Sequence, residues 1–367
     1  MKLQIGSVIK QYRRQREITQ EEFAEALGVS GQSVSRWELG LCYPDMEFLP
    51  VIAGFFGISV DQLMGIDDRT EQRKVEEYLA RFQEAISKGQ IDACISIARE
   101  GVAEYPNNYA LLNKLMYALF VAGDETGNIP NWKENMEKYD GEITALGERI
   151  MKYCPDTALR LEATARLAFH HCEQGRKATG RALFETLPSA KHFCKEQEMW
   201  WALEEDERLG FTRELVQIGY DYLVHGLYLM ADARLVPNEE VLKLYQKMEE
   251  LEVWFYDGVR KPSPHWGGCN RRYQMARVLC RLGRREEALE QLQAAADIAL
   301  AFDQRPETWV EHTLLLGEKT HRRTEFDTAD DRPLVKILGE SWMAQEDFDP
   351  IRETEAFQTL RRQLTAT

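Results

Sequence analysis

Apolar residues recur every three or four positions along most of the chain, which is the spacing that places side chains on one face of an α-helix. The first such stretch has Ile5, Val8, Ile9 and Tyr12 in this register and predicts a helix over 5–16. Alternating apolar and polar residues, which are typical of half-buried strands, are scarce, and runs of β-branched residues are absent. The pattern therefore predicts an all-α protein.

Residues 1–66 predict five short helices, because cap and turn residues interrupt the apolar pattern at short intervals. Thr19 followed by Glu22 is the capping-box pattern that begins the second helix, and Gly28 ends that helix. Ser30 is the expected cap of the third helix. The fourth and fifth helices begin near residues 45 and 60.

The segment GIDDRTEQR at 65–73 is polar and begins with glycine, as domain boundaries often do. We therefore expect a first domain over 1–66, a linker over 67–73 and a second domain over 74–367. Two Gly/Pro-rich stretches inside the second domain, 123–132 and 257–268, are expected to be loops.

The second domain contains candidate helical hairpins of the tetratricopeptide type. The clearest are 273–298, with a turn at Gly283, and 82–106, with a turn at Gly89; weaker units are expected at 161–188 and 196–226. Such hairpins bury their apolar faces by stacking on one another. The sequence thus predicts an antiparallel helical-hairpin solenoid, closed by the C-terminal segment. Small residues that allow close helix packing are Cys94, Gly101, Ala276, Ala288 and Ala295.

Charge changes this picture in one respect. The chain has 46 Lys and Arg against 61 Asp and Glu, a formal charge of −15, which opposes non-specific coating of nucleic acids or anionic membranes. Residues 1–66 carry six basic and eight acidic side chains and are close to neutral. No run of 18 apolar residues and no signal-peptide pattern is present, so we expect a soluble cytoplasmic protein without a membrane partner.

No cofactor, metal or catalytic site is expected. The seven cysteines are scattered without a C-x-x-C pair, which is typical of reduced thiols. His170, His171 and Cys172 are adjacent, but neighbouring residues on a helix point about 100° apart and no second ligand pair follows at metal spacing. Phosphate-binding loops, nucleophile elbows and metalloprotease motifs are absent, so the protein is not expected to be an enzyme.

One run, from Thr19 to Met64, resembles the phage-repressor-like (XRE) helix-turn-helix family. The matching motifs are TQEE with Ala24, GVS at 28–30, QSVSRWE at 32–38, Gly40, PD at 44–45, and the final DQLM. The resemblance implies a five-helix DNA-binding domain whose helix 20–27 crosses the DNA backbone and whose helix 30–38 enters the major groove.

The resemblance also implies roles for single residues. Gln32, Ser33 and Arg36 share one face of the third helix and would contact base edges, because Gln pairs with adenine and Arg with guanine. Gln20 matches the family's phosphate-contacting position, at the positive end of a helix. The resemblance assigns Arg13 and Glu38 to a structural ion pair.

Three cations of the first helix, Lys10, Arg14 and Arg16, either add phosphate contacts or form a solvated helix face. Two departures from the family reduce the number of DNA contacts: Gly31 replaces a polar or basic side chain, and Leu39-Gly40-Leu41 lacks the usual Asn and Lys. Because affinity grows with the number of neutralised phosphates, one copy should bind poorly. We therefore expect a homodimer on double-stranded DNA.

A helix-turn-helix followed by tetratricopeptide-like repeats resembles the peptide-responsive regulators of Gram-positive bacteria. This architecture implies dimerisation, and a peptide or protein effector bound in the repeat groove. Trp200, Trp201, Tyr220, Tyr222 and Trp254 either line such a groove or belong to the solenoid core. The alternative function is a protein-interaction adaptor whose helix-turn-helix serves docking or dimerisation instead of DNA readout.

Overall fold

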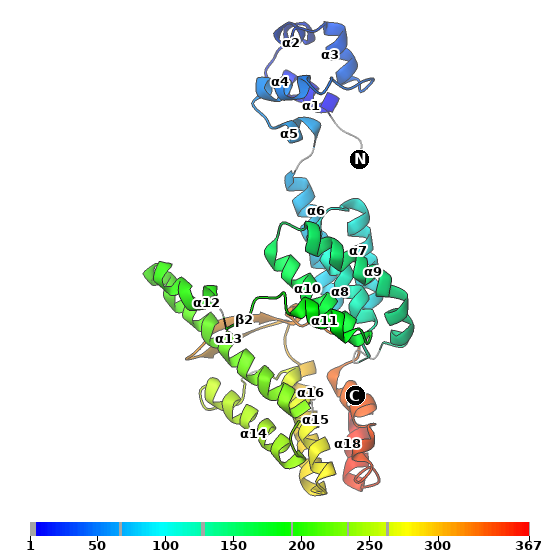
Figure 1. Cartoon of the computed structure of the whole chain (residues 1–367), viewed down its shortest axis with the longest axis vertical. Coiled ribbons are helices and arrows are strands. Elements are labelled where there is room, and N and C mark those ends of the chain that lie inside the picture. Colours follow the sequence, from blue (N-terminus) through cyan, green and yellow to red (C-terminus); the bar gives the residue numbers. More distant parts are fainter. Residues whose placement is uncertain are drawn as a thin grey trace. The chain divides into compact units, whose positions relative to one another are not determined.

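We analysed a computed structural model, which describes residues 5–65, 68–125, 129–191, 194–232, 235–261 and 264–366. The prediction of an all-α protein with an N-terminal helix-turn-helix and helical hairpins is confirmed, apart from one pair of strands (Figure 1). The chain forms two compact units, one ending at Ala80 and one beginning at Arg81. Each unit is described by itself.

The first unit contains the five short helices that the capping residues predict. Their apolar faces meet in one core, in which Ile9, Phe23, Val34, Ile52 and Leu63 are completely buried. The helices are α1 (Ile5–Gln15), α2 (Gln20–Leu27), α3 (Gly31–Glu38), α4 (Phe48–Phe56) and α5 (Val60–Met64).

Helix α6 (Asp68–Ile86) continues from the first unit into the second. It begins inside the segment expected to be a linker, of which residue 67, together with residue 66 before it, lies outside the described residues. The C-terminal part of α6 contributes Phe82, Ala85 and Ile86 to the core of the second unit. The boundary between the two units, at Ala80 and Arg81, therefore lies within one continuous helix.

The second unit begins with a stack of antiparallel hairpins, which we call the first stack (81–184). Gly89 adopts a left-handed φ of +66° in the turn between α6 and α7, as the repeat pattern requires. Cys94 is completely buried at the small packing position predicted for it. The helices that follow α6 are α7 (Ile91–Glu104), α8 (Tyr109–Ala122), α9 (Trp132–Tyr153), α10 (Thr157–Glu173) and α11 (Lys177–Phe184).

A second stack (205–303) follows. Its closest hairpin is the one predicted at 273–298, where Ala276, Ala288 and Ala295 are completely buried between the two helices and Gly283 forms the turn. The core of this stack is separate from that of the first stack. The helices are α13 (Glu205–Asp232), α14 (Asn238–Phe255), α15 (Trp266–Arg281) and α16 (Arg285–Asp303).

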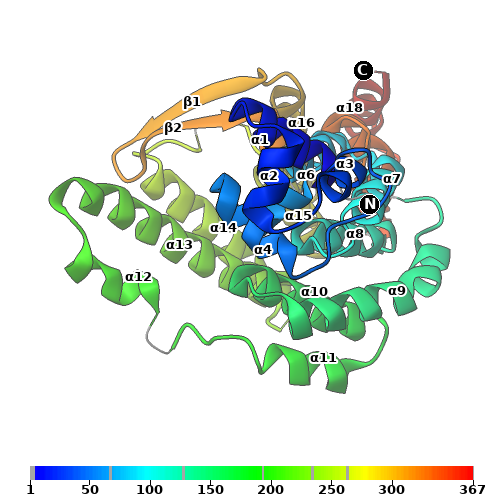
Figure 2. The same cartoon turned by 90° about the horizontal axis from the view of Figure 1, so that it is seen from above.

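The hairpin expected at 196–226 is wrong. Only the short α12 (Lys195–Glu198) and the 3-10 helix η2 (Met199–Ala202) precede α13, which runs without a turn through Gly210. A glycine inside a helix costs only about 1 kcal/mol, so the 28 residues of α13 tolerate it. Figure 2 shows α13 beside α14, with a long connection back to α11. The solenoid is therefore interrupted between the two stacks.

The prediction of an all-α protein is wrong at one place. Strands β1 (Thr308–Thr313) and β2 (Gly317–Arg322) form an antiparallel hairpin in which Thr308 pairs with Arg322. The buried side of β1 carries Glu311 and Thr313, whereas Val310 is 59% exposed. Because polar residues face inward and an apolar residue faces outward, the usual strand pattern is inverted.

The C-terminal segment packs on the second stack, as predicted for a closing element. Phe348, Ile351 and Phe357 are completely buried in the core of that stack. Its elements are the 3-10 helix η3 (Arg323–Glu325), α17 (Leu334–Lys336), the π-helix η4 (Ile337–Trp342), the 3-10 helix η5 (Glu346–Phe348) and α18 (Glu355–Ala366). None of the helices in the described ranges combines the length and apolar character needed to cross a membrane.

Candidate nucleic-acid interface

Helices α2 and α3 are fixed by caps at three of their four ends. The Thr19 hydroxyl accepts a hydrogen bond from the backbone N–H of Glu22, while Oε2 of Glu22 accepts one from the N–H of Thr19 at 2.6 Å. Gly28 ends α2 with a left-handed φ of +70°. Ser30 then caps α3 by accepting from the N–H of Ser33. These contacts set the tight turn that holds α3 against α2.

The outer face of α3 presents two of the three residues predicted to read bases. Gln32 and Arg36 are exposed, and within the described residues their side chains have no hydrogen-bond or ion-pair partner. Val34 and Trp37 point the other way and are buried in the core. The third residue, Ser33, is half-buried, and its hydroxyl lies 2.9 Å from that of Ser30. Gln32 and Arg36 are thus the freest side chains on this face.

A buried polar cluster anchors the end of α3 to α1 and α2. Nε of Arg13 donates to Oε1 of Glu38 at 2.6 Å and Nη2 donates to Oε2 at 3.0 Å, so the ion pair is bidentate. Gln20 adds a third bond, from Nε2 to Oε2 of Glu38 at 2.8 Å. Burial by itself would raise the pKa of Glu38, but the hydrogen bonds from Arg13 and Gln20 outweigh it and lower that pKa. Glu38 therefore stays ionised inside the domain.

The cluster also explains how Gln20 is used. One amide hydrogen is committed to Glu38, which fixes the side chain at the start of α2 beside the third helix. Arg13 is committed in the same way, because its Nη1 also donates to the carbonyl of Ile18 at 2.7 Å. Both residues hold α3 in place rather than extending freely from the surface.

Arg16 has an internal role that the sequence did not reveal. Its Nη1 donates to the carbonyl of Phe55 at 2.5 Å and its Nη2 to that of Phe56 at 2.9 Å. These carbonyls end α4, where a cation is favoured by the helix dipole. These two bonds hold the guanidinium at the end of α4 and leave one N–H on each terminal nitrogen. Lys10 and Arg14 differ, because their side chains form no hydrogen bond or ion pair with other described residues.

The start of α3 is electrostatically unfavourable for a polyanion. A Cβ placed on Gly31 would lie 3.5 Å from Oε1 of Glu21, so a carboxylate stands where relatives of this family offer a contact. The segment after α3 adds exposed apolar side chains, with Met46 84% exposed. This apolar surface was not predicted, although the run LGLCYPDM at 39–46 marks it. Its other members are Leu39, Leu41 and Tyr43.

The adjacent histidines on α10 belong to a structural network in the second unit. Nε2 of His170 lies 2.7 Å from Oδ1 of Asp140, and Nε of Arg176 donates to Nδ1 of His171 at 2.8 Å. Burial is the first cause that lowers the pKa of both histidines. No group of three His, Cys, Asp or Glu side chains with metal-binding geometry occurs among the described residues.

Comparison with known proteins identifies the same region. The helix-turn-helix family model matches residues 9–63. The HTH-type transcriptional activator BcrR of Enterococcus faecalis is 31% identical over 86 residues, which are 21% of this chain and 42% of BcrR. The uncharacterized HTH-type transcriptional regulator MJ0272 of Methanocaldococcus jannaschii is 35% identical over 60 residues, 16% of this chain and 91% of that protein.

Among solved structures, the complex of Bacillus thuringiensis PlcR with the peptide PapR7 and DNA aligns with 82% of this chain and 96% of PlcR. The sequences are 19% identical and the TM-score is 0.32, a likeness too slight to carry an argument about this chain. The match to BcrR spans less than half of that relative's length. The family model that matches lies within the N-terminal unit.

Proposed function

Because the chain belongs to the helix-turn-helix family of transcriptional regulators, we propose that it binds operator DNA sequence-specifically and as a homodimer. The observation that carries this proposal is the free outer face of α3. Gln32 and Arg36 are exposed and without protein partners among the described residues, on a helix whose opposite face is fixed in a core. Such a helix can enter a major groove without rearrangement.

In this proposal Arg36 and Gln32 read base edges, and Ser33 contributes only when its hydroxyl leaves Ser30. Lys10 and Arg14 contact phosphates, and the backbone N–H groups at the start of α2 add a contact beside Gln20. Arg16 supports the site indirectly through α4. Two free cations of α1 per copy give weak electrostatic anchoring, since each neutralised phosphate adds to affinity. A second copy doubles the number of anchors.

Helix α13 offers a surface for that second copy. Two rows of apolar side chains, each 38–66% exposed, repeat every seven residues along it. Gly219 and Gly226 lie between the rows, and a Cβ on either would meet nothing within 4 Å. We call this surface the α13 open face. Its rows are Leu215, Tyr222 and Leu229, and Val216, Leu223 and Met230.

The period of the α13 open face indicates what covers it. Apolar residues spaced by seven keep a seam along one side of a helix, which is the pattern by which one helix packs along another. Glycines between the rows let the two backbones approach closely. None of the eight residues is charged, so a copy of the same face meets no unpaired charge under twofold symmetry. We therefore assign dimerisation to α13.

The helical unit also gives the regulator a place for an effector. The two stacks have separate cores, and the segment 323–333 links them. A peptide or protein bound between elements of the two stacks would change their arrangement and thereby the dimer. This part of the proposal concerns the second unit alone.

Operator selection tests the proposal. The purified full-length protein is incubated with a random duplex library, and bound DNA is sequenced after several rounds. We expect an enriched pseudo-palindrome with half-sites about one helical turn apart. If no sequence is enriched, the result contradicts sequence-specific DNA binding and favours the adaptor function. The carboxylate beside Gly31 and the exposed apolar segment 39–46 are the observations that support this alternative. Arg36→Ala serves as the matched control that should lose the enriched motif.

A further inference from the structure

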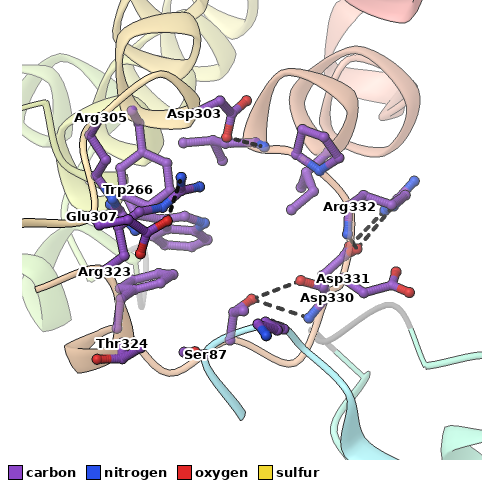
Figure 3. Close-up of a pocket in the computed structure, with 17 residues that line it drawn as sticks. Ser87, Trp266, Asp303, Arg305, Glu307, Arg323, Thr324, Asp330, Asp331 and Arg332 are labelled. Atoms are coloured by element: carbon purple, nitrogen blue, oxygen red, sulfur yellow. Dashed lines mark hydrogen bonds and ion pairs between the residues drawn. The ribbon is translucent and has the colours of Figure 1, made fainter. Parts of the chain in front are cut away.

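A cavity of about 410 Å³ lies inside the second unit, where four segments distant in sequence come together. Figure 3 shows Trp266, Arg305 and Arg323 along one wall, Asp330 and Arg332 on the other, and Ser87 from the α6–α7 turn below. The volume falls within the range of small-molecule sites. The repeat patterns did not predict this cavity. Its lining joins the α6–α7 turn, α15 and the end of α16 with the irregular segment 323–337, and the patterns do not relate these parts to one another.

Most charged groups around the cavity are neutralised by the protein. The Asp303 carboxylate accepts hydrogen bonds from the N–H groups of Leu334 and Val335 at 2.9 and 3.0 Å. Asp330 binds Arg332, whose Nη1 also donates to Glu340 at 2.9 Å. The acidic side of the cavity is thus largely satisfied by internal partners.

Among the cations that line the cavity, Arg305 is the exception. Its Nε is buried without a hydrogen-bond partner, and it forms no ion pair with any carboxylate of the described residues. The guanidinium instead stacks 3.5 Å above the ring of Phe302. Burial, and then the positive charge of Arg323, lower the pKa of Arg305 to about 10. A partly desolvated cation beside a second cation is unfavourable unless an anion joins them.

Arg323 is only weakly compensated. Its Nη1 lies 3.6 Å from Oε1 of Glu307, and both side chains are substantially exposed. An exposed pair at this distance contributes little. Arg323 is therefore free to turn toward an anion held by Arg305.

The same wall provides apolar surface. The ring of Phe326 packs edge-on against that of Phe302, with centroids 5.4 Å apart, and Trp266 lies beside them on the lining. An anion with an apolar body could place its charge at the guanidinium groups and its body against these rings. Inorganic phosphate would satisfy the charge but leave the aromatic surface uncovered.

We propose that this cavity binds a small carboxylate with an apolar body, held by Arg305 and Arg323 and packed against Trp266, Phe302 and Phe326. A free aromatic or aliphatic acid and the C-terminal carboxylate of a short peptide share this chemistry. Bidentate pairing of a guanidinium with a carboxylate is strong where water is excluded. The ligand carboxylate supplies the hydrogen-bond acceptor that Nε of Arg305 lacks among the described residues.

The position of the cavity also gives its ligand a role in regulating DNA binding, an inference that rests on the proposed DNA-binding function. The lining includes Ser87 and Lys88, directly after α6, as well as the end of α16 and the segment 323–333. A bound carboxylate would join the α6–α7 turn to the second stack. Because α6 continues into the first unit, the ligand is placed to change operator affinity through that helix.

The test is calorimetric titration of the full-length protein without DNA. The probes are hydrocinnamate and N-acetyl-glycyl-phenylalanine, each compared with its neutral amide. We expect each acid that binds to do so at least tenfold more tightly than its amide. Tighter binding of hydrocinnamate identifies a free acid as the ligand source, and tighter binding of the dipeptide identifies a peptide C-terminus. Absence of saturable binding of both acids at millimolar concentration would overturn the proposal.

Two variants separate the site from the rest of the surface. Arg305→Met removes the charge and keeps an unbranched apolar chain over Phe302, so the preference for acid over amide should disappear while the melting temperature does not fall. Arg322→Met removes a neighbouring exposed charge outside the cavity and should bind as wild type does. Retention of acid binding by Arg305→Met would show that the anion sits elsewhere. Failure of operator selection would leave these titrations unaffected, so the two proposals can fail separately.

Discussion

At the scale of single residues, Glu38 joins three helices through one carboxylate. Its side chain is 2% exposed and that of Arg13 is 12% exposed, so the pair is shielded from water and salt. Gln20 completes the cluster from α2. Helix α3 gains its fixed orientation from these bonds, which thereby hold Gln32 and Arg36 in place.

Arg13→Met should destabilise α1–α3, because it leaves the buried carboxylate of Glu38 without its cation. We expect the free energy of opening of α1–α3 to fall by about 3 kcal/mol, measured by hydrogen exchange of the full-length protein. Arg14→Met is the matched control, since Arg14 is exposed and should change the exchange little. Equal exchange in the two variants would contradict the structural role of Arg13.

The same carboxylate gives a pH dependence with a defined sign. The folded pKa of Glu38 is lowered, so the stabilisation is present above the unfolded pKa, about 4.3, and is lost as the pH falls through the lower folded value. Exchange protection of α1–α3 should therefore decrease below about pH 4. In Glu38→Gln this component of the acid sensitivity should be missing.

Arg36 and Arg14 should fail in different ways. Arg36→Ala should cost about 1–3 kcal/mol on the selected operator and much less on unrelated DNA, because a base contact is lost. Arg14→Ala should weaken both complexes by similar factors, because a phosphate contact carries no sequence information. Fluorescence anisotropy with the two duplexes measures both. Equal losses for Arg36→Ala would exclude its base-reading role.

At the scale of elements, packing within the chain accounts for few of the apolar side chains of α13. Only Ala231 is buried among its 28 residues, and α14 is its main neighbour. Leu223→Glu places a charge in the α13 open face and should convert the dimer to a monomer, as measured by light scattering after gel filtration. Leu314→Glu, at another exposed apolar position, should leave the dimer intact. A dimeric Leu223→Glu protein would exclude this surface.

Local signals determined how far the elements could be predicted. Thr19, Gly28 and Ser30 act within one turn of chain, so the helices of the first unit followed from the sequence. The β1–β2 hairpin did not, because Glu311 faces inward and Val310 outward. Arg16 showed the same limit: its carbonyl partners lie about forty positions away, at the end of α4, and no sequence spacing reveals them.

At the scale of the whole molecule, acidic residues lie mostly outside the first unit. The remaining charge after residue 66 is −13, so in the proposed complex DNA affinity depends on a few cations of a nearly neutral domain. With Lys10 and Arg14 from each of two copies, about four phosphates are neutralised. The logarithm of affinity should then fall with the logarithm of salt concentration with a slope of about −4, and about −2 for monomeric Leu223→Glu. A slope near zero would contradict phosphate anchoring.

The cavity at Arg305 marks the limit of prediction at this scale. Ser87, Trp266, Arg305 and Arg323 come from parts of the chain separated by up to 236 positions, and no motif of the sequence joins them. Repeat patterns predict which helices pair with their neighbours along the sequence. They do not predict the return of residues 323–333 to the first hairpin, which depends on contacts formed after both stacks exist.

The return of residues 323–333 to the first hairpin affects the order in which parts of the protein can fold during synthesis. Gln83 donates to the carbonyl of Thr324 at 2.8 Å, across 241 positions, and the N–H of Thr328 donates to Ile86. At a translation rate of about 5–20 residues per second, the first hairpin waits roughly 10–50 s for these partners. The first unit can fold in that interval. Helix α3 can therefore be complete in each new molecule while the segment that carries Arg323 has yet to leave the ribosome.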